Sequence, residues 1–418
     1  MNAIAAGMQP GLFGWWRGGT IEGKRALVAA SLGWMLDSFD VMLYALVLTA
    51  LMRDIGIDAP TAGLLGSVTL LASAAGGMVF GVIADRFGRT RALMGSILIY
   101  SVFTAMCGLA QTVWQLAVFR VFLGLGMGGE WASGAALVSE TWSAEHRGKA
   151  LGFMQSSWAI GYGAAAIVTA LVMPRWGWRA VFFVGVLPAL LTFWVQRRVR
   201  EPEIWVAHRA TAPASGFGFG RIFASGRLGV TVAVTLMNAC TMFAWWGFNL
   251  WLPGYLSLPP AQGGVGLSTA AMSGFVVAMQ IGMWFGYVTF GYASDWLGRR
   301  RAYVTYLLAA AVLILIYVSV RTPIILLALG PFVAFFATGY FTGFGAVTAE
   351  IYPTAIRATA QGFTYNIGRV ASAVAPFAVG SLAVTHGFGT ALSICSLAFV
   401  LAAVFWIWIP ETAGRRLE

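Results

Sequence analysis

The chain has 418 residues, of which 59% are hydrophobic and only 10% are charged, and its net charge is +11. A soluble domain carries about 25% charged residues, so this composition, with a mean hydropathy of +0.79, excludes a soluble globular protein. The sequence predicts an all-α integral membrane protein.

Apolar runs divide the chain into twelve predicted transmembrane helices. A hydrocarbon core about 30 Å thick needs about 20 apolar residues to cross as a helix. No short apolar leader with a cleavage site precedes the first run, so we expect that run to stay in the mature protein. The predicted spans are 26–52, 61–83, 92–111, 113–138, 149–172, 179–196, 228–252, 267–291, 302–320, 322–348, 358–384 and 388–409.

The distribution of Lys and Arg predicts the orientation, because positively charged loops stay in the cytoplasm. With the N-terminus inside, the outer segments hold only Arg53, Arg175, Arg179 and Arg321, and the remaining loop Lys and Arg lie inside. Both termini are therefore expected on the cytoplasmic side of the inner membrane. The excess positive charge is explained by the lipid surface and does not require a nucleic-acid partner.

An internal repeat with a shift of 210 residues predicts two homologous halves. GVIADRFGR at 81–89 recurs as GYASDWLGR at 291–299, and the same shift carries Glu140 onto Glu350. We expect two six-helix bundles, 26–196 and 228–410, with the substrate at their interface. An N-terminal segment 1–25, a basic linker 197–227 and a tail 411–418 would all be cytoplasmic.

The repeated loops place carboxylates beside arginines at helix ends, where such pairs can latch helices in one state and release them in another. The alternative is a solvated loop whose arginines obey the positive-inside rule. The latch residues are expected to be Gly81, Asp85, Arg86, Gly88, Arg89, Glu140 and Arg147 in the first half, and Asp295, Gly298, Arg299, Glu350 and Arg357 in the second.

These loops and the 6+6 layout resemble the major facilitator superfamily over nearly the whole chain. Three stretches, LDSFDVMLYALVL at 36–48, RVFLGLGMGGEWASGAALVSETWSAEHRGKALG at 120–152 and EIYPTAIRATAQGFTYNIGR at 350–369, narrow the resemblance. They are similar to metabolite:proton symporters, closest to the sialate and monocarboxylate branch and next to the aromatic-acid branch. The resemblance implies proton-coupled import of an organic acid by a monomer.

Ionisable residues inside predicted spans are costly, by about 2.5–3.5 kcal/mol, and usually mark a transport pathway or a proton relay. Asp37 and Asp40 share a helix face and are expected to take up the coupled proton, with Glu130 as a further candidate and Arg120 as their counter-charge. The alternative is a structural ion pair between the first and fourth spans.

Arg369 is the candidate anchor for a substrate carboxylate, since a guanidinium binds carboxylates through two hydrogen bonds. An intramolecular salt bridge is the alternative. Polar and aromatic side chains in other apolar runs either line the same site or form interhelical hydrogen bonds. These candidates are Tyr44, Gln155, Asn238, Trp245, Asn249, Gln280, Tyr340, Tyr365 and Asn366.

Two nucleotide-binding motifs fail their context. Gly124, Gly126 and Gly129 match G-x-G-x-x-G inside a predicted span, where Gly124 and Gly128 instead predict the close approach of another helix. The run GGTIEGKR at 18–25 lacks the Ser or Thr that holds magnesium. The cysteines lie inside spans and the histidines are isolated, so we expect no metal, no cofactor and no enzyme activity.

The expected function is therefore proton-coupled symport of a small organic acid anion, driven by the proton gradient. An exporter or facilitator of another small metabolite, such as a sugar or a drug, is the alternative, and a channel or receptor also fits the composition. The substrate stays open between a monocarboxylate, an aromatic acid and a sialate-like sugar acid.

Overall fold

The computed structural model describes residues 14–201, 227–352 and 357–413, and their long segments are helical. The expected linker 197–227 and the two terminal segments therefore lie largely outside the described residues. Helices of the first part are α1 (Gly14–Gly18), α2 (Ile21–Ile55), α3 (Ala59–Phe87), α4 (Arg89–Cys107), α5 (Val113–Thr141), α6 (Ala144–Val184) and α7 (Ala189–Arg198). The second part has α10 (Leu228–Ser257), the 3-10 helix η1 (Pro260–Gln262), α11 (Thr269–Leu297), α12 (Arg299–Ser319), α13 (Pro323–Thr338), α14 (Phe341–Ile351), α15 (Arg357–Ser372) and α16 (Val374–Phe405).

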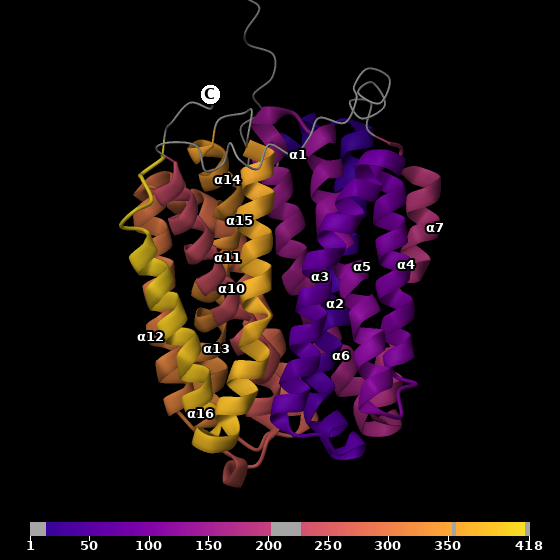
Figure 1. Ribbon diagram of the computed structural model, residues 1–418, viewed down its shortest axis with the longest axis vertical. Helices are drawn as coiled ribbons and strands as arrows, with labels where there is room; N and C mark the ends of the chain where they lie inside the picture. Colours follow the sequence, from indigo (N-terminus) through magenta and orange to yellow (C-terminus); the bar gives the residue numbers. More distant parts are fainter. Residues whose placement is uncertain (1–13, 202–226, 353–356, 414–418) are drawn as a thin grey trace, which may run out of the picture.

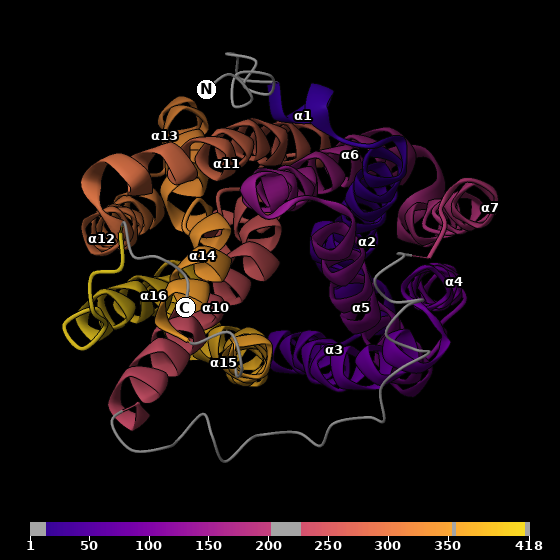
Figure 2. The same ribbon diagram turned by 90° about the horizontal axis from the view of Figure 1, so that it is seen from above.

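The long helices run side by side along one axis, with α1 and the C-terminal end at the same end of the bundle (Figure 1). We call this end the terminal face, and the opposite end, where α2 turns into α3, the distal face. Viewed along the bundle, α2–α7 gather on one side and α10–α16 on the other (Figure 2). The two groups meet where α6 lies against α11 and where α3 lies against α15 and α16.

Ten helices in the described parts of the chain are long and apolar enough to cross a membrane. The longest two, His146–Arg198 and Ala360–Phe405, are interrupted by glycines with positive φ, Gly177 at 74° and Gly387 at 78°. Each interruption falls between two of the predicted spans. A positive φ is accessible to glycine without strain, so both breaks are set by the sequence.

Two further breaks were not predicted. The predicted span 322–348 is divided between α13 and α14 at Gly339 and Tyr340, and the predicted span 358–384 is divided between α15 and α16 at Ala373. At the first break, the Tyr303 hydroxyl donates a hydrogen bond of 2.8 Å to the Tyr340 carbonyl. This side chain partly replaces the hydrogen bonding that the interrupted helix leaves open.

The glycines of α5 pack against neighbouring helices, as predicted for Gly124 and Gly128. A Cβ added to Gly124 would lie 2.9 Å from the Ala72 methyl group on α3, and one added to Gly128 would lie 2.5 Å from the Gly77 amide nitrogen. Gly126 faces α4 in the same way. The G-x-G-x-x-G run therefore serves close helix packing, and the prediction is confirmed.

Candidate functional site

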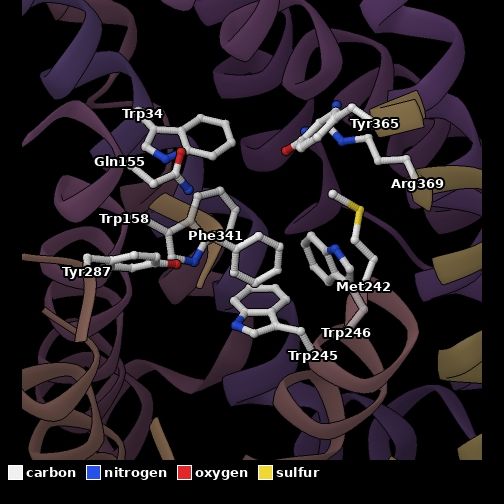
Figure 3. Close-up of a pocket in the computed structure, with 10 residues that line it drawn as sticks. All are labelled: Trp34, Gln155, Trp158, Met242, Trp245, Trp246, Tyr287, Phe341, Tyr365 and Arg369. Carbon is white, nitrogen blue, oxygen red and sulfur yellow. The ribbon is translucent and has the colours of Figure 1, made fainter. Parts of the chain in front are cut away.

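A cavity lies between the two groups of helices, and its walls come from both (Figure 3). The first group contributes α2 and α6, and the second contributes α10, α11, α14 and α15. The volume of about 40 Å³ holds a few water molecules. The lining residues are Trp34, Gln155, Trp158, Met242, Trp245, Trp246, Tyr287, Phe341, Tyr365 and Arg369.

Four of the predicted substrate residues line this cavity: Arg369, Gln155, Trp245 and Tyr365. Arg369 and Tyr365 are one turn apart on α15, and the guanidinium carbon lies 5.4 Å from the centre of the Tyr365 ring. Gln155 on α6 is a hydrogen-bond partner of Tyr287 on α11. The cavity thus combines a guanidinium, an amide and a hydroxyl with aromatic walls.

Other predicted substrate residues lie away from the cavity and hold helices in place. The Asn238 side chain on α10 donates to the Thr364 carbonyl on α15 at 3.1 Å, and the Tyr340 hydroxyl donates to the Thr241 carbonyl at 3.4 Å. These contacts are the interhelical hydrogen bonds that were the alternative for such residues.

The remaining predicted residues are also absent from the cavity wall. Asn249 and Asn366 each donate to a carbonyl one turn earlier on their own helix. The Tyr44 hydroxyl donates to the Ala62 carbonyl at 2.7 Å. Gln280 packs beside Gly163 where α11 meets α6, and its Oε1 has no hydrogen-bond partner among the described residues.

Sequence reasoning missed six of the lining residues, and most of these are aromatic. Tryptophan in membrane proteins is enriched at the two lipid–water interfaces. Four tryptophans of the cavity instead lie in the middle of long apolar helices: Trp34, Trp158, Trp245 and Trp246. This unusual position is the signal that could have identified Trp34, Trp158 and Trp246. The six are Trp34, Trp158, Met242, Trp246, Tyr287 and Phe341.

One stacked pair of rings lies between the cavity and the terminal face. Trp131 on α5 and Tyr365 on α15 have ring centres 4.3 Å apart and planes only 6° from parallel. Both lie about 12–15 Å along their helices from the terminal face, whereas Trp158 and Trp245 lie about 20–25 Å deep. The pair joins the two groups of helices across the mouth of the cavity.

Closure toward the distal face is thicker and involves the backbone. A Cβ added to Gly63 on α3 would lie 2.9 Å from the backbone carbonyl carbon of Pro376 on α16, and one added to Gly380 would lie 2.7 Å from the Ala59 carbonyl oxygen. Helix backbones therefore touch on this side, whereas side-chain contacts, such as the Trp131–Tyr365 stack and Thr342 beside Gly152, join the halves on the other.

Three buried carboxylates lie on the first group of helices beside the cavity. Asp37 and Asp40 on α2 are each 1% exposed, and Glu130 on α5 is fully buried. Neither oxygen of Glu130 has a hydrogen-bond donor among the described residues, and the Thr104 side chain on α4 interacts with Asp40. Asp37 acts electrostatically on both of the others, so the three form one group.

Arg369 is the cation that acts on this group. The positive charge of Arg369 acts on Asp37 and Glu130. Among the described residues, Arg369 makes no direct ion pair with either of them. The same guanidinium lines the cavity. One side chain therefore faces the cavity and the buried carboxylates at once.

Arg120 is not placed as the counter-charge that the sequence predicted. Its guanidinium carbon lies 3.6 Å from the centre of the Tyr44 ring, and its Nε donates to the Leu65 carbonyl at 3.2 Å. It makes no ion pair with the described carboxylates. The physical reason is that the Tyr44 ring covers the Arg120 guanidinium and the Leu65 carbonyl on α3 accepts its hydrogen bond. The cation that acts on the buried carboxylates is instead Arg369.

Tyr100 on α4 is a further residue that sequence reasoning missed. Its hydroxyl donates to the Gly33 carbonyl on α2 at 3.4 Å, and it interacts electrostatically with all three carboxylates. Gly33 also gives room to Glu130, whose Oε1 would lie 2.5 Å from a Cβ added at that glycine. In the sequence, the only indication of this role is that Tyr100 is a tyrosine inside an apolar run.

Comparison with known families shows the class to which this protein belongs. The model of the Major Facilitator Superfamily matches residues 30–279 and 256–418. The chain belongs to this superfamily.

Proteins with similar sequences are named as transporters. A sialic acid transporter of Escherichia coli is 31% identical over 90% of this chain and 91% of its own length. A cis,cis-muconate transport protein of Acinetobacter baylyi is 31% identical over 91% of this chain and 92% of its own. The crystal structure of a D-xylose-proton symporter has the same fold, with a TM-score of 0.77 at 21% identity over 94% of this chain and 99% of its own. The protein is thus a multi-pass membrane transporter and not an enzyme.

The predicted latch residues of this superfamily protein form two equivalent ion pairs at the terminal face. Arg89 at the start of α4 pairs with Glu140 on α5 at 2.9 Å, and Arg299 at the start of α12 pairs with Glu350 on α14 at 2.9 Å. Arg299 also pairs with Asp295. Each pair joins helices of the same group, so these ion pairs tie neighbouring helices within one half.

The other predicted latch residues contribute in different ways. The side chains of Arg86 and Arg147 are exposed, and a Cβ on Gly81 would meet no atom within 4 Å. The side chains of Asp85 and Arg357 lie outside the described residues.

Two glutamates that sequence reasoning missed complete the latch in this superfamily member. Glu201 accepts hydrogen bonds from the backbone amides of Thr90 and Arg91, and Glu411 accepts them from Arg299 and Arg300. Both glutamates therefore cap a helix N-terminus, where negative charge is stabilised. Their numbers differ by 210, the repeat shift, which is the signal that could have found them.

The predicted glycines Gly88 and Gly298 explain how each glutamate reaches the helix end. Their φ values are 114° and 88°, in the region that other residues rarely adopt. A Cβ on Gly298 would lie 2.9 Å from a carboxylate oxygen of Glu411, and one on Gly88 would likewise contact Glu201.

Glu411→Gln tests the cap of α12. Burial of Glu411 opposes its ionisation, but four backbone amides, those of Ala413, Arg300, Arg299 and Thr412, outweigh this effect and lower the pKa of the carboxyl below its ordinary 4.5. A lowered pKa in the folded state stabilises the fold above pH 4.5, and the contribution is lost as the pH falls through the folded value. Thermal unfolding in detergent should show a loss of about 1–2 kcal/mol at pH 7 that shrinks toward pH 3. Glu22→Gln, on an exposed carboxylate, is the control, and an equal difference at both pH values would contradict the assignment.

Trp131→Ala tests the closure toward the terminal face. In a background with Cys107, Cys240 and Cys395 replaced by Ala, Met242→Cys places a thiol in the cavity. Removing the Trp131 ring should speed the labelling of this thiol by a bulky maleimide about twofold to tenfold, because an aromatic pair contributes about 0.5–1.5 kcal/mol. Phe122→Ala, on the same helix and outside the cavity wall, should leave the rate unchanged. An unchanged rate in Trp131→Ala would show that other contacts close the cavity.

Proposed function

We propose that this protein is a proton-coupled symporter that imports a small organic acid anion by alternating access. The observation that carries the proposal is the position of Arg369, which borders the cavity and acts on Asp37 and Glu130. A guanidinium in a cavity is suited to bind a carboxylate, and buried carboxylates beside it are suited to carry protons. The names of the sialic acid and muconate transporters support an organic acid as the cargo.

The coupling would follow from charge balance around Arg369. Ionised carboxylates without hydrogen-bond donors are costly inside a membrane protein, and either a cation or a proton removes that cost. When the substrate carboxylate engages Arg369, the electrostatic support for Asp37 and Glu130 weakens. These carboxylates, with Asp40, then take up the proton that travels with the anion.

The membrane topology proposed with this function has twelve spans in two six-helix bundles, 26–196 and 228–410. Breaks at Gly177 and Gly387 inside the two longest helices support this number. The terminal face would be cytoplasmic, because the repeated arginine-rich loops lie on it. The latch ion pairs would then stabilise the cytoplasmic ends of each half during the transition.

The proposed transporter would act as a monomer within the inner membrane, without a cofactor. The proton gradient would supply the energy, and the residues 197–227 would follow the lipid surface. Arg120, stacked on Tyr44, would stabilise the first half through α3 and would not carry the proton.

Asp40→Asn separates coupling from binding. In proteoliposomes, this variant should lose accumulation driven by a pH gradient, because the amide cannot be protonated, and it should retain counterflow of labelled substrate without a gradient. Arg369→Ala should lose both, since the anion then has no anchor. Glu22→Gln controls for removal of an exposed carboxylate.

Full gradient-driven accumulation by Asp40→Asn would refute a proton role for Asp40. Undiminished substrate binding by Arg369→Ala in detergent would instead make Arg369 a purely structural cation.

A further inference from the structure

We infer that the transported anion is a flat, unsaturated carboxylate that carries a second hydrogen-bond acceptor at its opposite end. This inference rests on the proposed function, and it assigns the two ends of the ligand to the two halves of the protein. Arg369 of the second half would hold the carboxylate, and the indole N–H of Trp158 in the first half would hold the second acceptor.

The walls of the cavity favour a flat ligand. Seven of the ten lining residues are aromatic, and the rings of five of them, those of Trp34, Trp158, Trp245, Trp246 and Phe341, are linked by mutual contacts. The Trp158 ring centre lies 4.6 Å from that of Trp34, 5.7 Å from that of Trp245 and 6.2 Å from that of Trp246. Aromatic faces and edges pack well against a conjugated ligand. Because the volume is only about 40 Å³, the rings must separate to admit any organic acid, and a flat molecule requires the smallest separation.

The polar groups of the cavity favour a ligand rich in acceptors. The indole nitrogens of Trp34, Trp158 and Trp245 are buried donors without a hydrogen-bond partner among the described residues, and these side chains are only 3–4% exposed. A buried donor without an acceptor is costly, so a ligand atom that accepts from it gains affinity. Among the described lining residues none is acidic, and the guanidinium adds further donors.

The donors occupy two sides of the cavity. Figure 3 shows Arg369 on one side and Trp34, Gln155 and Trp158 on the other. Arg369 comes from α15, whereas Trp34 comes from α2 and Trp158 from α6. A ligand with acceptors at both ends would therefore connect the two halves, which a ligand with a carboxylate alone would not do.

This reasoning disfavours a polyhydroxylated acid. Each hydroxyl group brings a donor as well as an acceptor, and the aromatic walls offer few acceptors to receive it. A short monocarboxylate could engage Arg369 but would leave the indole donors unpaired. The cavity thus distinguishes among the organic acids that the proposed function leaves open.

The test compares isonicotinate with benzoate, which have the same shape and differ by one ring nitrogen opposite the carboxylate. Isothermal titration calorimetry on the purified protein in detergent should give a dissociation constant for isonicotinate about threefold to tenfold lower, the range expected for one net hydrogen bond. Trp158→Phe keeps the aromatic wall and removes the N–H. In that variant the ratio of the two dissociation constants should fall to about one, with benzoate affinity nearly unchanged.

Trp406→Phe is the matched control, because its indole nitrogen is also buried without a partner but its ring packs against Tyr303 outside the cavity wall. It should leave both affinities unchanged. Equal binding of isonicotinate and benzoate to the unaltered protein would overturn the inference, as would a ratio that persists in Trp158→Phe.

Uptake in proteoliposomes separates failure of this inference from failure of the proposed function. If sialic acid or lactate accumulates with the pH gradient while isonicotinate and benzoate do not bind, the symporter proposal stands and the flat bifunctional ligand is wrong. If none of these acids accumulates with the gradient, the proposed function fails and the inference fails with it.

Discussion

The rest of the structure depends on the position of Arg369, which interacts electrostatically with the buried carboxylates and also borders the cavity. Asp37 and Glu130, across the boundary between the halves, supply the negative charge that acts on the buried Arg369 guanidinium. Because Arg369 also borders the cavity, any anion that enters competes for the same cation. Substrate binding and protonation of the carboxylates are then coupled, because both depend on the charge of Arg369.

The packing around this cation is asymmetric, and the asymmetry fits a protein that opens on one side at a time. Toward the distal face, Gly63 and Gly380 let helix backbones of the two halves touch. Toward the terminal face, side chains such as the stacked rings of Trp131 and Tyr365 join the halves, and Tyr365 lies one turn from Arg369. A ligand at Arg369 therefore contacts the element that closes the cavity.

The sequence predicted the helical membrane fold and the equivalence of the two repeated loops, because composition and a constant repeat shift report directly on both. The pairing of Arg89 with Glu140 and of Arg299 with Glu350 came from the structure. It also placed Arg369, Gln155 and Trp245 at one site, since polar groups in apolar helices have few other uses. It could not assign the partner of each charge. Arg120 and Arg369 are both arginines inside apolar runs of the sequence, and only the structure shows that Arg120 stacks on Tyr44 whereas Arg369 acts on the carboxylates.

Proton uptake on ligand binding is the measurement that tests the shared role of Arg369 most directly. A pH indicator in weakly buffered detergent solution would report protons taken up as an organic acid saturates the purified protein. The account predicts uptake of about one proton per bound anion, and none in the triple variant Asp37→Asn, Asp40→Asn, Glu130→Gln. Saturable anion binding to the unaltered protein without any proton uptake across the pH range would contradict it.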